Sequence, residues 1–382
     1  MTSFSNEETS AEPDFQKAEI QALDALFEQA GLKRNLRGKA GVTLQMRFER
    51  SSAQELLPST PLPRIAPNGV KWLAVAGWQK LGWLWHGFST RRSGLSRAYC
   101  ADDAPGELNL GFTADDQRET VERNRRLLAE AVTGDAATPL VALKQIHSNL
   151  VRVAGATDAN RENPAKADGL MTNVPGLLLG IQTADCIPVL VADRRRRVVA
   201  AFHAGWRGTV KRIVESGVGR MRLDFGSRPE DLIAAIGPGI GPCCYAVGEE
   251  TLVEFESQFS YARELFREVY DADPVRTKYP MLFLTQRAPG HSPIGPSLHL
   301  NLVEANRRQL LAAGLKPRAI TSVGGCTSCQ RELFFSHRGS QGRAGRMMSV
   351  IGIKAKPESY LQKSSSGTFE VSGHDFSRAA NG

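Results

Sequence analysis

The fold is decided by a stretch from Gly180 to Gly208 that reads GIQTADCIPVLVADRRRRVVAAFHAGWRG. Its two apolar, β-branched runs flank a charged turn, which predicts a β-hairpin. With a four-residue loop from Asp193 to Arg196, the thiol of Cys186 faces the imidazole of His203 across the two strands. The Cβ atoms of such a pair lie roughly 5 Å apart, which suits two ligands of one metal or a thiolate beside its base.

Two features of this stretch leave alternatives open. Pro188 cannot donate a ladder hydrogen bond, so its strand should be an edge strand or begin there. Cys186 and His203 could also be a small core residue beside a hydrogen-bonded core histidine, because free cysteine is often simply buried.

The composition is that of a soluble globular protein, with 41% hydrophobic and 23% charged residues among 382. No apolar run approaches the roughly 20 residues of a membrane span. The N-terminus carries no secretory signal and six cysteines are too few for a disulfide scaffold, so we expect a cytoplasmic protein. The net charge of +8 is compatible with an anionic ligand. Arg194 to Arg197 lack interleaved aromatic residues, which favours a solvated turn over a nucleic-acid surface.

The chain divides into three parts. Residues 1–69 form an extension with a helix expected from Asp14 to Leu32 and a proline-rich linker, residues 70–355 form the main domain, and residues 356–382 form a tail expected to be disordered. The main domain alternates strands with helices, and we expect helices over 117–132, 209–223 (with Thr209 as N-cap), 249–269 and 301–313. Residues 271–297 are rich in Pro and Gly and are interpreted as an inserted loop.

A third potential ligand stands at the end of another predicted strand. His147 completes a set of one thiolate and two imidazoles with Cys186 and His203. Three protein ligands with an open fourth position are typical of catalytic zinc, and the same donors are compatible with copper.

Glycine-rich turns provide further candidates. One of them, Gly205-Trp-Arg207-Gly208-Thr209, joins a strand to a helix. Its backbone N–H groups and the Arg207 guanidinium could bind phosphate. Alternatively, the segment is a tight turn with a surface arginine. The run from Gly237 to Gly241 is either a rim loop of the site or a corner. Cys326 and Cys329 form a CxxC motif without a second pair, for which we expect a structural or incidental role. No role is assigned to the remaining histidines, which are His86, His291, His299, His337 and His374.

Seven motifs in order resemble the YfiH-type laccase-domain family, which is also described as multicopper polyphenol oxidases or purine nucleoside phosphorylases. They are His86-Gly-Phe-Ser-Thr-Arg91, Leu108-Asn-Leu-Gly111, Gln145-Ile-His147, Thr183-Ala-Asp-Cys-Ile-Pro-Val189, His203-Ala-Gly-Trp-Arg-Gly208, Ile236-Gly-Pro-Gly-Ile-Gly-Pro-Cys-Cys-Tyr245 and Gly345-Arg-Met347. The chain departs from the family pattern at Arg92-Ser93-Gly94, at Ser336-His337-Arg338 and at His299, which bears on substrate choice and pocket shape.

The resemblance implies a compact α/β (α+β) domain with mixed sheets flanked by helices. It implies zinc, or alternatively copper, held by His147, Cys186 and His203. It also implies phosphorolysis of adenosine, inosine and methylthioadenosine, and deamination of adenosine. The expected partners are therefore purine nucleosides and phosphate.

Further roles are assigned on these motifs. Arg207, Gly205 and Gly208 are candidates for phosphate binding, and Gln145 and Arg91 for phosphate or substrate binding. Asp185 is the candidate for proton transfer or for orienting a ligand.

Three other functions stay open. Cys186 could be the nucleophile of a metal-free hydrolase with His203 as its base. A copper-dependent polyphenol oxidase would use the same residues as copper ligands. A basic nucleic-acid-binding protein is the non-enzyme alternative, supported only by the charge. The sequence makes no prediction of oligomeric state.

Overall fold

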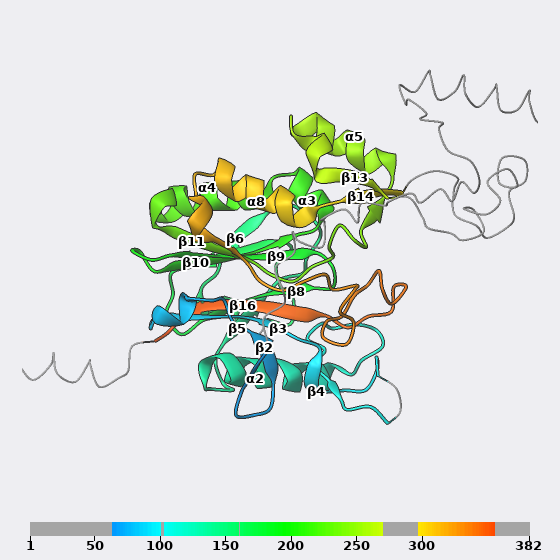
Figure 1. Ribbon diagram of the computed structural model, residues 1–382. Helices are drawn as coiled ribbons and strands as arrows, with labels where there is room; N and C mark the ends of the chain where they lie inside the picture. The colour runs from blue at the N-terminus through cyan, green and yellow to red at the C-terminus, as the bar shows by residue number, and fades with distance from the viewer. Residues whose placement is uncertain (1–62, 101–102, 160, 270–296, 356–382) are drawn as a thin grey trace, which may run out of the picture. The chain divides into compact units, whose positions relative to one another are not determined.

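The computed structural model describes residues 63–100, 103–159, 161–269 and 297–355 (Figure 1). All of them belong to one unit of the chain, Ser52–Gly382. The predicted helix from Asp14 to Leu32, the tail from residue 356 and nearly all of the predicted insertion lie outside the described residues.

The first of two six-stranded sheets collects strands from both ends of the described chain. Met347–Ile353 (β16) lies between strands from the beginning and the middle of the chain, and every one of its residues is buried. Only the pair β5–β8 is parallel. In sheet order the strands are β1 (Arg64–Ile65), β2 (Lys71–Leu73), β3 (Leu84–Ser89), β16, β8 (Leu178–Thr183) and β5 (Leu140–Ala142).

The second sheet is built around the predicted hairpin, whose strands β9 and β10 are buried along their full length. The pairs β11–β15 and β6–β7 are parallel and the others antiparallel. In sheet order the strands are β15 (Ile320–Ser322), β11 (Leu232–Ile236), β9 (Ile187–Asp193), β10 (Val198–Ala204), β7 (Gly169–Thr172) and β6 (Val151–Val153).

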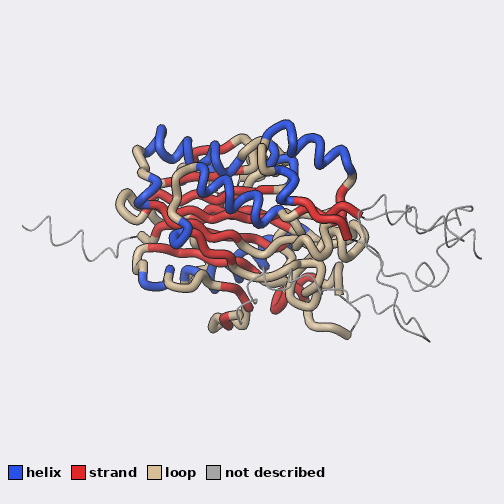
Figure 2. The backbone as a smooth tube through the Cα atoms, turned by 45° about the horizontal axis from the view of Figure 1, so that its top comes forward, coloured by secondary structure: helices blue, strands red, loops and turns tan. Residues whose placement is uncertain are grey.

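Helices cover the outer faces of the two sheets (Figures 1 and 2). Arg118–Thr133 (α2) packs on the first sheet, burying Val121 and Leu128. Trp206–Val210 (α3), Ile213–Phe225 (α4) and Leu302–Ala312 (α8) cover the second. Another cluster of buried apolar side chains fills the space between the sheets, and it includes Phe88, Ile181, Leu190 and Ala201. The expectation of an α/β domain with mixed sheets flanked by helices is confirmed.

The hairpin forms, but its predicted register is wrong by two residues. His203 pairs with Pro188 and the loop is Arg194–Arg197. The cause is the Asp193 carboxylate, which accepts hydrogen bonds from the backbone N–H groups of Arg195 and Arg196 and so starts the turn one residue later. Because the shift is an even number of residues, the side chains of β9 and β10 stay on their predicted faces. Cys186, which was expected to pair with His203, instead lies just before β9 and has no partner in the hairpin. Pro188 is the second residue of β9, a central strand that begins at Ile187, so of the two alternatives the strand starts beside the proline and is not an edge strand.

The helix predicted from Thr209 to Leu223 is also corrected, because two helices take its place. Helix α3 begins at Trp206 with Gly205 as N-cap, and α4 begins at Ile213. Arg212 between them is in the left-handed region, with φ 59°, which ends one helix and starts the next. The Thr209 hydroxyl accepts a hydrogen bond from the side chain of Asn306 and is not a cap.

A third, smaller sheet includes residues that were predicted to be helical. The helix expected from Glu249 to Val269 ends at Gln258 (α5), and Phe266–Val269 (β13) pairs with β14 instead. The sheet order is β12 (Ala246–Val247), β14 (Ser297–Leu300) and β13. The remaining elements are β4 (Arg92–Ser96) and the 3-10 turns Trp78–Lys80, Ala156–Asp158, Pro229–Asp231, Ala262–Leu265 and Pro317–Ala319.

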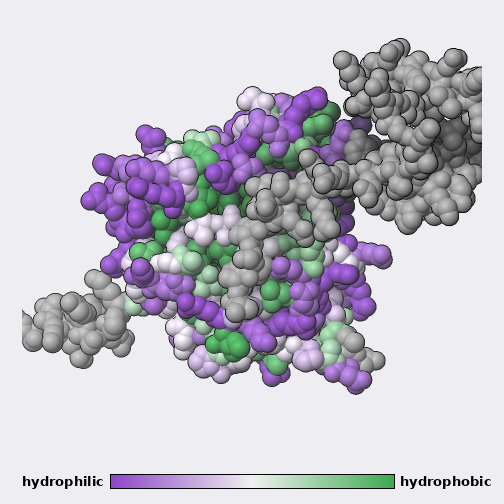
Figure 3. Space-filling model, viewed as in Figure 1, coloured by the Kyte–Doolittle hydropathy of each residue, from purple (hydrophilic) through white to green (hydrophobic). Residues whose placement is uncertain are grey.

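The surface agrees with the polar composition. Hydrophilic side chains cover much of the face shown in Figure 3, with smaller apolar areas between them. Arg194 to Arg197 are exposed, as expected for a solvated turn. None of the helices in the described ranges has the length and hydropathy to span a membrane.

Candidate metal centre

The three residues predicted as metal ligands converge at one point. His147 follows β5, Cys186 lies in the short connection between β8 and β9, and His203 belongs to β10. Their ligand atoms all lie within 4.8 Å of one another. The Cys186 Sγ is 3.9 Å from the His147 Nε2, and the two imidazole rings are 4.9 Å apart at 73°. Segments from both sheets therefore bring a thiol and two imidazoles together.

A buried carboxylate that the sequence did not single out organises this centre. Asp168, which is fully buried, accepts a hydrogen bond from the Nδ1 of His203 at 2.8 Å. It also accepts from the backbone N–H groups of Ile146, His147 and Ser148 and from the Ser148 hydroxyl. The same carboxylate thus fixes the orientation of His203 and the loop that carries His147. No motif marks it in the sequence, since its partners lie 20 to 35 residues away.

The charges of the centre support one another. Burial opposes the ionisation of Asp168, but hydrogen bonds from His203 and Ser148 lower its pKa to about 2. Burial likewise opposes charges on Cys186 and His203. A thiolate next to an imidazolium offsets that cost, which lowers the pKa of the Cys186 thiol and raises the pKa of His203. The metal-free centre therefore favours a thiolate, the form of cysteine that binds metals and acts as a nucleophile.

The backbone around the ligands is shaped for close approach. His147 adopts the left-handed conformation with φ 57°, held there by the hydrogen bonds to Asp168. A Cβ atom on Gly205 would lie 2.9 Å from the Cys186 Sγ and 3.0 Å from the His147 Cδ2. Gly205 therefore makes room for two of the three ligands. Gly208 serves a similar purpose, because its Cβ would lie 3.1 Å from the Ser148 carbonyl oxygen.

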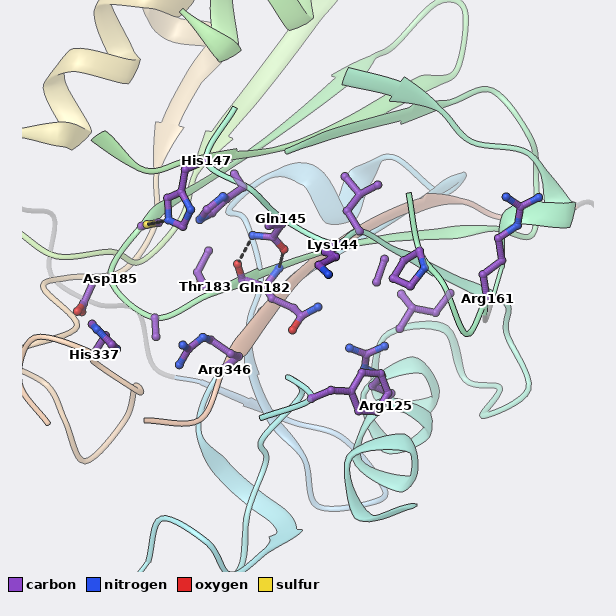
Figure 4. Close-up of a pocket in the computed structure, with 18 of the residues that line it drawn as sticks. Arg125, Lys144, Gln145, His147, Arg161, Gln182, Thr183, Asp185, His337 and Arg346 are labelled. Atoms are coloured by element: carbon purple, nitrogen blue, oxygen red, sulfur yellow. Dashed lines mark hydrogen bonds between the residues drawn. The ribbon is translucent and has the colours of Figure 1, made fainter. Parts of the chain in front are cut away.

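The three ligands line a cavity of about 660 Å³, a size typical of small-molecule sites. In Figure 4, His147 and Asp185 lie at one side of this cavity and Arg125 and Arg161 at the other. Positive side chains dominate the wall, namely Arg125, Lys144, Arg161, Arg338 and Arg346, against the acidic Glu162 and Asp185. The cavity therefore suits an anionic ligand.

Three of the four lining arginines, Arg125, Arg338 and Arg346, have no carboxylate partner within the described residues. The Arg338 guanidinium donates to the Ala246 carbonyl oxygen. The Arg125 guanidinium donates to the Leu110 carbonyl oxygen and lies over the ring of Phe112 at 4.2 Å. Burial lowers the pKa of Arg125 to about 10. The Arg346 guanidinium donates only to the carbonyl oxygens of Ala344 and Gly345 among the described partners. These guanidinium groups retain the capacity to bind an anion.

The two glutamines at the centre of Figure 4 differ in role, because one is held by hydrogen bonds within the protein and the other faces the cavity. The amide of Gln145 donates to the Gln182 carbonyl oxygen at 2.7 Å and accepts from the Gln182 N–H at 2.8 Å, which ties the loop before His147 to β8. The side chain of Gln182 lines the cavity. Gln145 was expected to bind phosphate or substrate, whereas no role was expected for Gln182, which belongs to the stretch quoted at the outset.

Asp185 lines the cavity, but both of its carboxylate oxygens are occupied. Its Oδ1 accepts from the Thr327 hydroxyl at 2.6 Å and its Oδ2 from the backbone N–H of Arg338 at 2.7 Å. These contacts give Asp185 the geometry of a residue that positions the wall of the cavity.

Two predicted arginines lie outside the lining. Arg91 forms an ion pair with Glu107 at 2.6 Å, and its guanidinium lies 4.7 Å from the centre of the Phe335 ring. The Arg207 guanidinium lies over the ring of Trp206 at 4.2 Å. Neither side chain is among those that line the cavity.

Comparison with known proteins identifies the family. Residues 85–354 match the family model described as multi-copper polyphenol oxidoreductase laccase. The chain belongs to this family, as the seven motifs predicted.

Similar curated proteins carry a different description. The chain is 35% identical over 277 residues to purine nucleoside phosphorylase YlmD of Geobacillus stearothermophilus, covering 70% of this chain and 89% of that protein. It is 35% identical over 298 residues to a purine nucleoside phosphorylase of Deinococcus radiodurans, covering 78% and 94%. The crystal structure of Bacillus licheniformis hypothetical protein YfiH is similar with a TM-score of 0.62 and 29% identity, covering 77% of this chain and 99% of that chain.

Proposed function

We propose that the protein is a zinc-dependent purine nucleoside phosphorylase that acts on adenosine, inosine and methylthioadenosine with phosphate, and that it also deaminates adenosine. The observation that carries the proposal is that the His147, Cys186 and His203 centre opens into a cavity with unpaired cations on its wall. Relatives at about a third identity named purine nucleoside phosphorylases support the substrate class.

The donor set fits zinc. One thiolate and two imidazoles are among the known ligand sets of catalytic zinc. The Nδ1 of His203 is engaged by Asp168, which leaves its Nε2 to face the other ligands, the arrangement typical of zinc-binding histidines. When bound there, the ion supplies Lewis acidity toward a substrate oxygen or a water.

In phosphorolysis, a phosphate oxygen bonds to the anomeric carbon of the ribose while the glycosidic bond to the purine breaks, and the purine takes up the proton that the phosphate loses. We assign Arg346 and Arg125 to phosphate; like that of Arg338, their guanidinium groups line the cavity without a carboxylate partner among the described residues. They would hold the nucleophile and offset its charge. The amide of Gln182 can both donate to and accept from the purine edge. This assignment replaces Arg207 and Arg91 by residues that reach the cavity.

The test is to incubate the metal-replete protein with inosine and phosphate and to measure hypoxanthine and ribose 1-phosphate. We expect Arg346→Ala to raise the KM for phosphate at least tenfold, and Arg207→Ala, the matched control, to leave it within twofold. A strong effect of Arg207→Ala alone would refute the phosphate assignment. Absence of turnover with any purine nucleoside would refute the function.

Two further assays test the deaminase and the oxidase activities separately. Adenosine supplied without phosphate should yield inosine, and its failure to do so would remove the deaminase part alone. Oxygen uptake with a phenol by copper-loaded protein, without hypoxanthine formation, would support the oxidase description instead.

A second candidate function has its own structural support. Cys186, His203 and Asp168 form a thiol–imidazole–carboxylate series, the arrangement of a cysteine hydrolase. In a metal-free hydrolase, His203 would carry the thiol proton while Cys186 attacks an acyl carbon. Activity that survives complete metal removal and is lost on alkylation of Cys186 would favour this reading over the zinc enzyme.

A further inference from the structure

Four cysteines form a second group of potential metal ligands, separate from the candidate metal centre. The CxxC motif was expected to lack a second pair, and this expectation is wrong. Cys243 and Cys244 supply that pair, since the sulfurs of these two residues and of Cys326 and Cys329 all lie within 4.8 Å of one another. The Cys329 Sγ is 3.4 Å from the sulfurs of both Cys243 and Cys244. None of the four is joined in a disulfide.

The distances between the sulfurs match a single tetrahedral ion. With Zn–S bonds of about 2.3 Å, the sulfurs of a tetrahedral site lie about 3.8 Å apart. A cluster of several irons would hold its cysteine sulfurs further apart, and a disulfide would use only two of the four. We propose that Cys243, Cys244, Cys326 and Cys329 bind a structural Zn²⁺ ion.

The backbone holds the four cysteines in place before any metal binds. Gly239 and Cys326 form a β-bridge, and the Thr327 N–H donates to the Gly239 carbonyl oxygen at 3.0 Å. Each pair of cysteines also lies on a turn, since the Cys244 N–H donates to Gly241 and the Gln330 N–H to Cys326. These hydrogen bonds fix the distance between the two pairs, so the ordering cost of metal binding is small.

The four cysteines are also open to solvent on one side. Cys326 is buried, whereas Cys243 and Cys329 are exposed, so an ion can enter from solvent.

The proposed ion would tie together two walls of the cavity described above. Tyr245 follows Cys244 and lines the cavity. Thr327 follows Cys326 and donates to the Asp185 carboxylate, which neighbours Cys186. The proposal does not depend on the function of the cavity, because its test counts and characterises the metal.

The first experiment measures zinc per full-length chain by elemental analysis after purification with zinc and without chelators. In the Cys186→Ala background we expect one equivalent of zinc, with X-ray absorption showing sulfur ligands alone at about 2.3 Å. Adding Cys326→Ser with Cys329→Ser should remove that equivalent, and the matched control Cys100→Ser should not. Absence of zinc in the Cys186→Ala protein, iron in its place, or nitrogen ligands would overturn the proposal.

A second experiment needs no variant and so covers the case in which a substitution prevents folding. Alkylation of the native protein is followed residue by residue by mass spectrometry, with and without a chelator. We expect Cys243 and Cys329 to react at least tenfold faster after chelation, while Cys100, which lies outside both clusters, reacts at an unchanged rate. Equal rates for Cys243 and Cys329 with and without chelator would refute the site.

Discussion

Substitution of Asp168 by Asn tests whether this carboxylate builds the metal centre. The side chain accepts hydrogen bonds from three backbone N–H groups, from the Ser148 hydroxyl and from the His203 ring, and it is fully buried. Asparagine keeps the shape, but it loses the charge and turns an NH₂ group toward some of these donors. Loss of a buried, charged acceptor costs about 3–5 kcal/mol.

The effect on the metal should be equally measurable. Removing the partner of a metal-binding histidine typically lowers affinity 10- to 100-fold, which corresponds to about 1.4–2.7 kcal/mol. We therefore expect Asp168→Asn to weaken zinc binding at His147, Cys186 and His203 by this factor. A competition titration with a chromogenic chelator measures the affinity, and urea unfolding measures the stability.

The matched control is Asp193→Asn. Asp193 is equally buried and caps the β9–β10 turn, so its substitution should lower stability without changing the zinc affinity of the centre. If Asp168→Asn binds zinc as tightly as the wild type, or if Asp193→Asn weakens binding to the same extent, Asp168 does not organise the centre.

Two further predictions concern single residues. Gly205→Ala should lower zinc affinity at least tenfold, because the added Cβ would displace Cys186 and His147. The control Gly219→Ala, where the added Cβ meets open space, should bind zinc as the wild type does. Equal zinc affinities of the two variants in a chelator titration would contradict this prediction. Burial lowers the pKa of His86 to about 4, with smaller contributions from nearby cations. The unfolded state therefore binds the extra proton first, and stability should fall by up to about 3 kcal/mol as pH drops from 6.5 to 4. The free energy of unfolding, measured by urea unfolding at each pH, should change less between pH 6.5 and pH 4 in His86→Gln. An unchanged dependence on pH in this variant would show that another group titrates.

Local patterns in the sequence were sufficient to predict the hairpin and the alternation of strands with helices, whereas the mixed sheets were expected from the resemblance to the family. The alternation of buried strands with amphipathic helices follows from periodicity, and the face occupied by His203 was correct because the register error was an even number of residues. The register itself depended on the Asp193 side chain, which competes with the ladder for the N–H groups of the turn. Periodicity alone does not reveal such a contact.

Other parts of the structure that were not predicted depend on contacts between distant segments. Asp168 acts on residues 20 to 35 positions away, and Cys326 and Cys329 meet Cys243 and Cys244 across more than 80 residues. The helix predicted to Val269 ended early because its last residues pair with β14. A single sequence has no local signal for any of these, since tertiary pairing overrides helical preference.

The connection between β8 and β9 has a consequence for how this domain responds to change. The two strands are consecutive in the chain but belong to opposite sheets, and Asp185 and Cys186 stand in the crossing, next to a cavity that both sheets wall. The sheets pack against each other through apolar side chains such as those of Ile181 and Leu190. We expect an exchange of an apolar residue in that interlayer to change the packing between the sheets and, with it, the spacing of the thiol and the imidazoles. Tuning of the reactive centre is thus open to residues that never touch a ligand.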